Sequence, residues 1–169
     1  MDNKEKAIKI YNLIKNGNIE QAKEIIITDN SLLGFVTPFG TWLHVAARAG
    51  KLDMIKFLIE SGMDININEG VPKSAPIAHA ASEGTISIVE YLFNHGAKLD
   101  VSDPNRNPLF SAIYGGHLDI VKFLVQNGID ITVKYTGDTM KDMGAYEFAI
   151  ERGQTEITEY LKQKLDERK

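Results

Sequence analysis

The amino-acid sequence predicts an all-α solenoid in which about five helix pairs stack side by side. The first observation is a glycine that recurs every 32 to 37 residues, at Gly17, Gly50, Gly84, Gly116 and Gly153. The second is a small or apolar pair three and four residues before each glycine, such as Ala46-Ala47. The third is an apolar cluster after it, such as LDMIKFLI and LDIVKFLV. One such unit cannot bury its apolar face alone, so the repetition indicates a stack of units.

Each unit is predicted to contain a helix, a glycine turn, a second helix and a loop. Alanines on the first helix let neighbouring helices approach closely, and the glycine adopts the left-handed conformation that other residues resist. On the second helix, Met54, Ile55 and Leu58 lie at helical spacing and form a buried face. We expect one domain over residues 1–169, with repeats at about 3–36, 37–70, 71–102, 103–135 and 136–169.

The two end units differ from the inner ones in a way that suits caps. The first unit has Gln21 where the second unit has Met54, and the last unit has Lys162 where the inner units are apolar. Polar residues at these positions are typical of the outward face of a capping repeat. The terminal helix ends in the polar segment KLDERK, which we expect to fray.

Composition excludes several classes of protein. The net charge of −4 argues against nucleic-acid binding, which needs a basic field to neutralise phosphates. The chain has no cysteine, which excludes a disulfide framework, a thiolate metal site and a cysteine nucleophile. No apolar run is long enough to span a membrane, and the first residues do not resemble a signal peptide. We therefore expect a cytoplasmic protein that is monomeric when free.

Three segments carry a resemblance to the ankyrin repeat family. They are GTWLHVAARAGKLDMIKFLIESGMDIN, SAPIAHAASEGTISIVEYLFNHGAKLD and RNPLFSAIYGGHLDIVKFLVQNGIDIT. The two end units resemble the same pattern as degenerate caps. The resemblance implies helix pairs joined by hairpin loops, and a function in binding another protein without catalysis. It also implies that partners bind the concave surface formed by the first helices and the hairpin tips.

The four histidines do not form a catalytic or metal-binding pattern. His44 occupies a position of the family pattern, and the resemblance implies that it hydrogen-bonds loop backbone near the hairpin. His79 borders the expected concave surface, where two interpretations stay open: contact with a partner, or an ordinary surface histidine. No H-E-x-x-H, G-x-S-x-G, G-x-G-x-x-G or Walker motif is present. We expect no catalytic residue, cofactor or metal site.

Residues that depart from the family pattern are the candidates for partner binding. On the first helices these are the residues that precede each glycine, and on the loops they are aromatic, basic or methionine residues. The predicted binding residues are Phe39, Trp42, Arg48, His79, Ser82, Glu83, Arg106, Tyr114, Tyr135, Met140, Glu151 and Arg152. Tyr and Arg are enriched at interface hot spots.

Three loops are irregular. In LLGFVTPFGTW, Trp42 and its aromatic neighbours either seal the first repeat against the second or form an exposed anchor. The loop NINEGVPKSAP is one residue longer than usual and contains Val71-Pro72. The loop ITVKYTGDTMKDMGAY is about four residues longer than the common hairpin, and residues 136–143 either bind a partner or pack locally.

The sequence thus predicts a non-catalytic protein-binding module. A more specific hypothesis is an intracellular immunity protein that neutralises a toxin, since the resemblance extends to small stand-alone bacterial ankyrin proteins. Two alternatives stay open. One is an adaptor or regulatory subunit of a larger complex, and the other is an ankyrin effector of an intracellular bacterium.

Overall fold

The computed structural model describes residues 2–70 and 73–168. Within these residues ten α-helices form five consecutive pairs. The first helices of the pairs are α1 (Asn3–Asn16), α3 (Trp42–Arg48), α5 (Pro76–Glu83), α7 (Pro108–Gly115) and α9 (Ala145–Glu151). The second helices are α2 (Ile19–Thr28), α4 (Leu52–Glu60), α6 (Ile86–Asn94), α8 (Leu118–Gln126) and α10 (Thr155–Asp166). A short 3-10 helix, η1 (Asn30–Leu32), follows α2.

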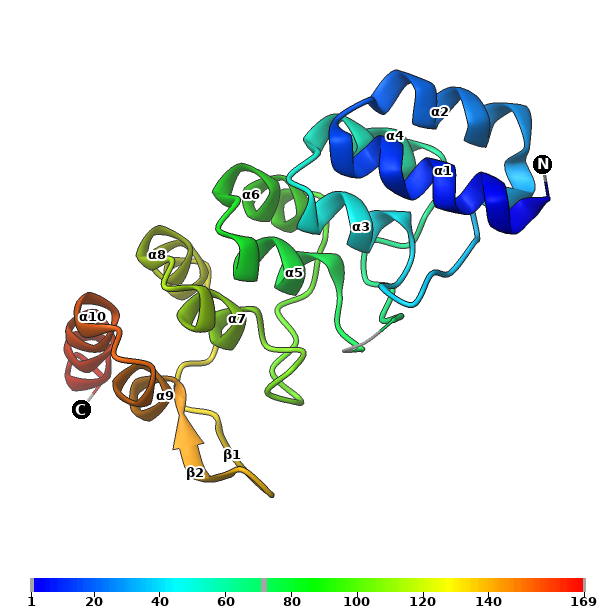
Figure 1. Ribbon diagram of the computed structural model, residues 1–169. Coiled ribbons are helices and arrows are strands. Elements are labelled where there is room, and N and C mark those ends of the chain that lie inside the picture. Colours follow the sequence, from blue (N-terminus) through cyan, green and yellow to red (C-terminus); the bar gives the residue numbers. More distant parts are fainter. Residues whose placement is uncertain (1, 71–72, 169) are drawn as a thin grey trace.

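The helices form two layers. Each first helix packs against the first helix of the next pair, from α1 through α9. In the other layer α2 contacts α4, and α8 contacts both α6 and α10. Figure 1 shows the pairs in a row from the N-terminal to the C-terminal end, and the loops between pairs all leave on one side of the row. The predicted solenoid of helix-turn-helix units is confirmed.

The core follows the repeated sequence pattern. Ala46, Ala47 and Ala80 are fully buried between the first helices, where larger side chains would hold the helices apart. On the second helices, Met54 and Leu58 are also fully buried. Burying each such large side chain away from water contributes about 1.5–3 kcal/mol to the free energy that stabilises the fold. The outer layer therefore supplies much of the apolar area, and the alanines set the spacing of the inner layer.

A glycine with a left-handed backbone ends the first helix of the third pair. Gly84 has φ +78°, and its N–H donates to the carbonyl of Ala80. A side chain at this position would collide with the imidazole of His117 in the next pair. The glycine therefore stops α5 and also lets the fourth pair approach the third.

The ends of the stack are polar where the inner pairs are apolar. Gln21 on α2 and Lys162 on α10 are exposed, whereas Met54 on α4 is fully buried. On α10, Ile157 and Leu161 turn inward and are buried. Each end helix therefore presents one apolar face to its neighbour and one polar face to solvent, as expected for caps.

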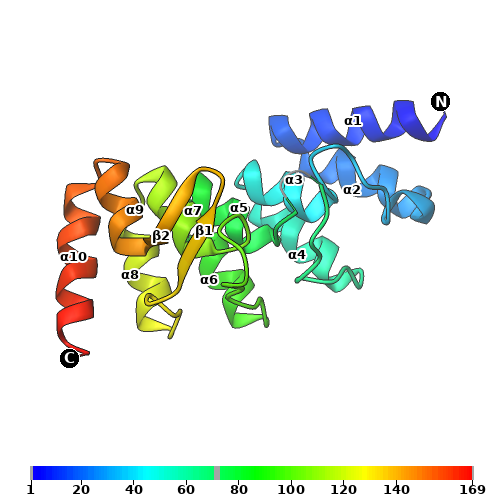
Figure 2. The ribbon, with the colours of Figure 1, turned by 90° about the horizontal axis from the view of Figure 1, so that it is seen from below.

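The long loop before α9 adds a small two-stranded sheet to the helical solenoid. It forms two antiparallel strands, β1 (Lys134–Gly137) and β2 (Met140–Gly144). The register shifts between Tyr135 and Gly137, and Asp142 has φ +49°. Figures 1 and 2 show this hairpin projecting beside α9 on the loop side of the stack. The extra residues of this loop therefore lengthen a β-hairpin rather than an irregular coil.

Candidate protein-binding surface

The exposed side chains of the first helices and of the adjoining loops form one face of the molecule, here called the inner face. It corresponds to the surface on which the sequence placed the binding residues. Its N-terminal part lies around α1, α3 and the turn at residues 37–40. Its C-terminal part lies around α7, α9 and the β-hairpin.

Trp42 does not belong to the inner face, which corrects its assignment as a binding residue. The side chain is fully buried, its indole Nε1 donates to the carbonyl of Leu32 at 2.7 Å, and its ring stacks on Phe35 with centroids 6.1 Å apart. The 3-10 helix η1 covers this position. Trp42 therefore seals the first pair against the second instead of presenting an anchor to a partner.

His44 braces two loops, as the family resemblance implied. The backbone N–H of Thr41 donates to Nδ1 at 3.1 Å, so the hydrogen of the neutral ring resides on Nε2. This Nε2 lies 2.8 Å from the carbonyl of Ser74 and donates to it. Burial lowers the pKa of the His44 imidazole, which is fully enclosed. The neutral ring thus ties α3 to the following loop.

His79 is buried as well, which corrects its assignment as a surface contact. Only 7% of the residue is exposed. Its Nδ1 accepts a hydrogen bond from Arg48 Nε at 3.1 Å, and its Nε2 then donates to Ser74 Oγ at 3.1 Å. Burial lowers the pKa of the His79 imidazole to about 3, and the charge of Arg48 acts in the same direction. His79 is therefore a neutral acceptor that positions the Arg48 side chain.

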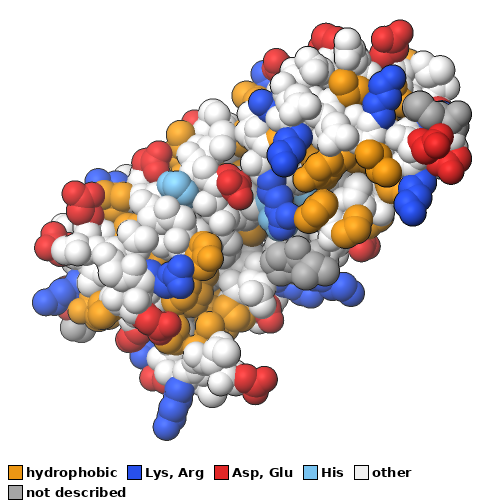
Figure 3. Space-filling model, in the orientation of Figure 1, with side chains coloured by type: hydrophobic (Ala, Val, Ile, Leu, Met, Phe, Trp, Pro, Cys, Tyr) orange, Lys and Arg blue, Asp and Glu red, His pale blue; other side chains and the backbone are white. Residues whose placement is uncertain are grey.

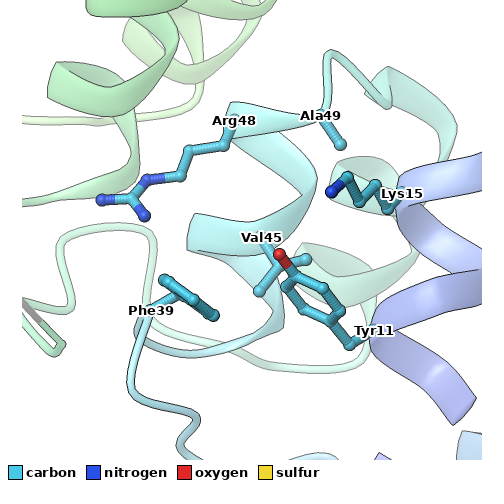
Figure 4. Close-up of a pocket in the computed structure, with 6 residues that line it drawn as sticks. All are labelled: Tyr11, Lys15, Phe39, Val45, Arg48 and Ala49. Atoms are coloured by element: carbon cyan, nitrogen blue, oxygen red, sulfur yellow. The ribbon is translucent and has the colours of Figure 1, made fainter. Parts of the chain in front are cut away.

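The N-terminal part of the inner face contains a hollow of about 170 Å³. Figure 4 shows the residues that line it: Tyr11, Lys15, Phe39, Val45, Arg48 and Ala49. The rings of Tyr11 and Phe39 stack with centroids 5.5 Å apart. The guanidinium carbon of Arg48 lies 5.9 Å from the centre of the Phe39 ring, within cation–π range. Two predicted binding residues, Phe39 and Arg48, therefore meet in one site.

The C-terminal part contains a larger hollow, of about 380 Å³. It is lined by Ser82, Pro104, Asn105, Phe110, Ser111, Tyr114, Met140 and Phe148. Tyr114 is 59% exposed, and the Arg152 guanidinium lies over its ring at 4.3 Å. This contact holds an aromatic side chain open to solvent at the edge of the hollow. The structure thus brings together Ser82, Tyr114, Met140 and Arg152.

The remaining predicted residues have separate roles or positions. The hydroxyl of Tyr135 donates to the carbonyl of Val101 at 2.8 Å and accepts from Asn107 Nδ2 at 3.0 Å, and burial raises the pKa of this phenol. Tyr135 thereby fastens the hairpin to the preceding loop. Arg106 forms an ion pair with Asp100 at 3.9 Å. The last two predicted residues, Glu83 on α5 and Glu151 on α9, are exposed.

Sequence reasoning missed Tyr11, Lys15, Phe110 and Phe148 as lining residues. A signal was present for two of them. Tyr11 and Phe110 stand six residues before their unit's glycine, the position that His44 occupies in the second unit. From this position Tyr11 lines the N-terminal hollow and Phe110 lines the C-terminal one. The irregular dipeptide Val71-Pro72 lies outside the described residues.

Residues 2–70 and 73–168 contain no group of three or more His, Cys, Asp or Glu side chains placed to hold a metal ion. Across the same residues, no helix combines the length and the apolar character needed to cross a membrane.

Comparison with known proteins identifies the repeats. The family described as ankyrin repeats (3 copies) matches residues 10–103 and 43–135, and ankyrin repeats (many copies) match residues 109–162. Glycerophosphocholine phosphodiesterase GDE1 of Candida albicans is 38% identical over 86 residues, which is 50% of this chain and 7% of that protein. The ankyrin repeat and KH domain-containing protein mask-1 of Caenorhabditis elegans is 28% identical over 148 residues, 72% of this chain and 6% of that protein.

A third relative, the B-cell lymphoma 3 protein homolog of Mus musculus, is 32% identical over 95 residues, 56% of this chain and 21% of that protein. The chain therefore spans a small part of each of these relatives, and the similarity lies in the repeats. Ankyrin repeats indicate a protein-interaction module. With the family patterns matching most of its length, the chain belongs to the ankyrin repeat family.

Proposed function

We propose that the inner face binds another protein and that the chain acts through this binding, without catalysis. The observation that carries the proposal is Tyr114, which is 59% exposed beside Arg152 at the mouth of the 380 Å³ hollow. Exposed aromatic residues held in place by neighbours are typical anchors, because little conformational entropy is lost when they are buried by a partner. A specific partner of usual size would cover about 800 Å² of this face.

The finer form of the proposal is that the partner is a toxin and that this chain is its cytoplasmic immunity protein, monomeric when free. The net charge of −4 and the sequence pI of about 5.6 support a basic target such as a nuclease. In the alternative form the partner belongs to a larger complex, in which this chain is an adaptor or regulatory subunit. An effector that acts in a host cell is the third form.

Co-expression distinguishes these forms. The product of the adjacent gene is expressed alone and together with this chain. If it is toxic alone and tolerated in the pair, Tyr114→Ala should restore toxicity and weaken binding by about 2 kcal/mol, a roughly thirtyfold rise in Kd. The matched control is Ile27→Ala on α2, where the side chain is 68% exposed on the opposite layer.

The outcomes separate the proposal from its finer forms. Restored toxicity with Ile27→Ala but not with Tyr114→Ala would show that the inner face is not the binding surface. A neighbouring product that binds without being toxic would replace the immunity form with the adaptor form. Secretion of the chain from the producing cell would favour the effector form.

A further inference from the structure

The turn at residues 37–40 holds an aromatic side chain rigidly at the surface. Thr37 and Gly40 exchange two backbone hydrogen bonds, at 2.9 and 3.0 Å, and the Thr37 hydroxyl accepts from the Phe39 N–H at 3.0 Å. Gly40 has φ +98°, and a Cβ there would lie 2.7 Å from His44 Cγ. Only glycine fits this position. The turn is therefore fixed by its own hydrogen bonds and lies close against the buried His44, while Phe39 remains 46% exposed.

A second apolar hollow, of about 280 Å³, adjoins the one in Figure 4. It is lined by Lys4, Ala7, Ile8, Tyr11, Phe35, Val36, Thr37, Pro38 and Phe39. Tyr11 and Phe39 line both hollows, and together the two form what we call the Tyr11–Phe39 groove. Ile8 is 56% exposed and Val36 is 48% exposed. Figure 3 shows apolar side chains gathered below α1, with basic side chains on either side. Large apolar side chains gathered at one surface mark an interaction site.

Basic side chains stand at both ends of the groove. Lys4 lines the second hollow, and Lys15 and Arg48 line the first. In Figure 4 the two basic side chains lie along one edge and the two aromatic rings along the other, with Val45 between them. Glu5 follows Lys4 in the sequence, and its carboxylate accepts a hydrogen bond from the backbone N–H of Asp2 at the start of α1. Among the described residues, the charged side chains that line the two hollows are therefore all basic.

The buried His79 helps to orient the Arg48 side chain, in addition to the rotamer preference of Arg48 itself. Its Nε donates to His79 Nδ1, which fixes the plane of the guanidinium beside the Phe39 ring. A guanidinium held in this way loses less entropy when it binds a carboxylate. The site therefore combines a fixed apolar anchor with a fixed positive charge.

We infer that the Tyr11–Phe39 groove binds a segment of the partner in which a large apolar side chain is flanked by Asp or Glu. The apolar side chain would fill the floor, and the flanking carboxylates would reach Lys4 at one end and Lys15 and Arg48 at the other. The basic side chains of the groove have the opposite sign to the net charge of the chain, which is −4. The expected preference for Asp or Glu therefore concerns the segment of the partner that enters the groove and not the partner's overall charge. The inference rests on the proposed protein-binding function and adds a second anchor point to it, separate from Tyr114.

A random-peptide library displayed on phage, selected against the full chain, tests the inference. We expect the selected peptides to carry an aromatic or large aliphatic residue next to Asp or Glu. Synthetic copies should bind about tenfold more weakly to Phe39→Ala and to Lys15→Glu, by fluorescence anisotropy. Binding should also weaken as salt is raised, because the rim contacts are exposed. Circular dichroism checks that each variant is folded.

Two variants serve as matched controls. Ile27→Ala removes an exposed apolar side chain from α2, and Lys162→Glu reverses an exposed charge on α10. Both should bind the peptides as the parent chain does. Should Phe39→Ala fail to fold, Val36→Asp places a charge in the same groove at an exposed position and takes its place.

Three results would overturn the inference. One is a selection that enriches nothing or enriches peptides without acidic residues. Another is peptides that lose affinity with Tyr114→Ala but not with Phe39→Ala or Lys15→Glu, a result that leaves the proposed function standing and removes only this groove from it. The third is a dimer in sedimentation velocity that Val36→Asp dissociates, which would mean that a second copy of the chain covers the groove.

Discussion

The buried His79 should make the stability of the protein depend on pH already between about pH 6.5 and 5, above the range in which ordinary carboxylates titrate. In the folded chain its pKa lies at about 3, against 6.5 for an ordinary histidine. Below pH 6.5 the unfolded chain takes up a proton that the folded chain does not bind. The free energy of unfolding therefore falls as pH falls from about 6.5 toward 3, and recovers as pH rises again.

The magnitude follows from the size of the pKa difference. Each pH unit within this range changes the free energy of unfolding by about 1.4 kcal/mol. Lowering the pH from about 7.5 to about 5 should therefore remove about 2 kcal/mol, because only the part below 6.5 contributes. Burial also lowers the pKa of His44, so its effect has the same sign. Asp29 has a lowered pKa too, but its contribution is lost only at more acidic pH, below the ordinary value of 3.8.

Urea unfolding followed by circular dichroism at several pH values measures this effect. The variant His79→Gln should flatten the profile between about pH 5 and 7.5, leaving only the part due to His44. The matched control, His95→Gln, makes the same substitution at an exposed position at the end of α6 and shows what the change of residue type does by itself. A parent chain that is equally stable at both pH values, or an unchanged slope in His79→Gln, would contradict the burial argument.

Three further changes test the fold. His44→Ala breaks the bond to the Ser74 carbonyl and should lower the free energy of unfolding by about 1–3 kcal/mol; an unchanged urea midpoint would refute the bracing role. Gly84→Ala should cost more than Gly62→Ala in the same assay, since both have positive φ but only the first would meet a neighbouring side chain. Truncation after Gly128 uncovers the apolar face of α8 and should give aggregates in size-exclusion chromatography; a stable monomer would mean that the last pair is not a cap.

The helix pairs were predictable because several local patterns agree. The glycine spacing, the alanine pairs and the apolar clusters each require the same arrangement, and none of them depends on a distant part of the chain. The β-hairpin was not predictable in this way. The strand β1 (Lys134–Gly137) is mostly exposed, so its sequence lacks the alternation of apolar and polar residues that marks a half-buried strand.

On the first helices, coverage by a neighbouring loop decided which predicted residues belong to the surface. Tyr114 stands two residues before its glycine, at the end of α7, and remains 59% exposed. Trp42 lies at the start of α3, where η1 covers it. His79 lies where Ser74 from the preceding loop closes over it. The local sequence predicts where a residue lies along its helix. Whether a loop covers that residue depends on other segments of the chain, which the repeat pattern does not describe.

A departure from the family pattern therefore has two meanings, which the structure separates. His79 departs from the pattern and is buried, so we expect it to influence binding only through the Arg48 side chain that it positions. Phe39 also departs from the pattern, but a rigid turn keeps its ring exposed. The two residues act on one site from opposite sides, one from beneath and one at the surface. Replacing His79 should alter the position of the Arg48 guanidinium, whereas replacing Phe39 should remove apolar contact area. We therefore expect partner specificity to depend on the core as well as on the surface of the N-terminal repeats.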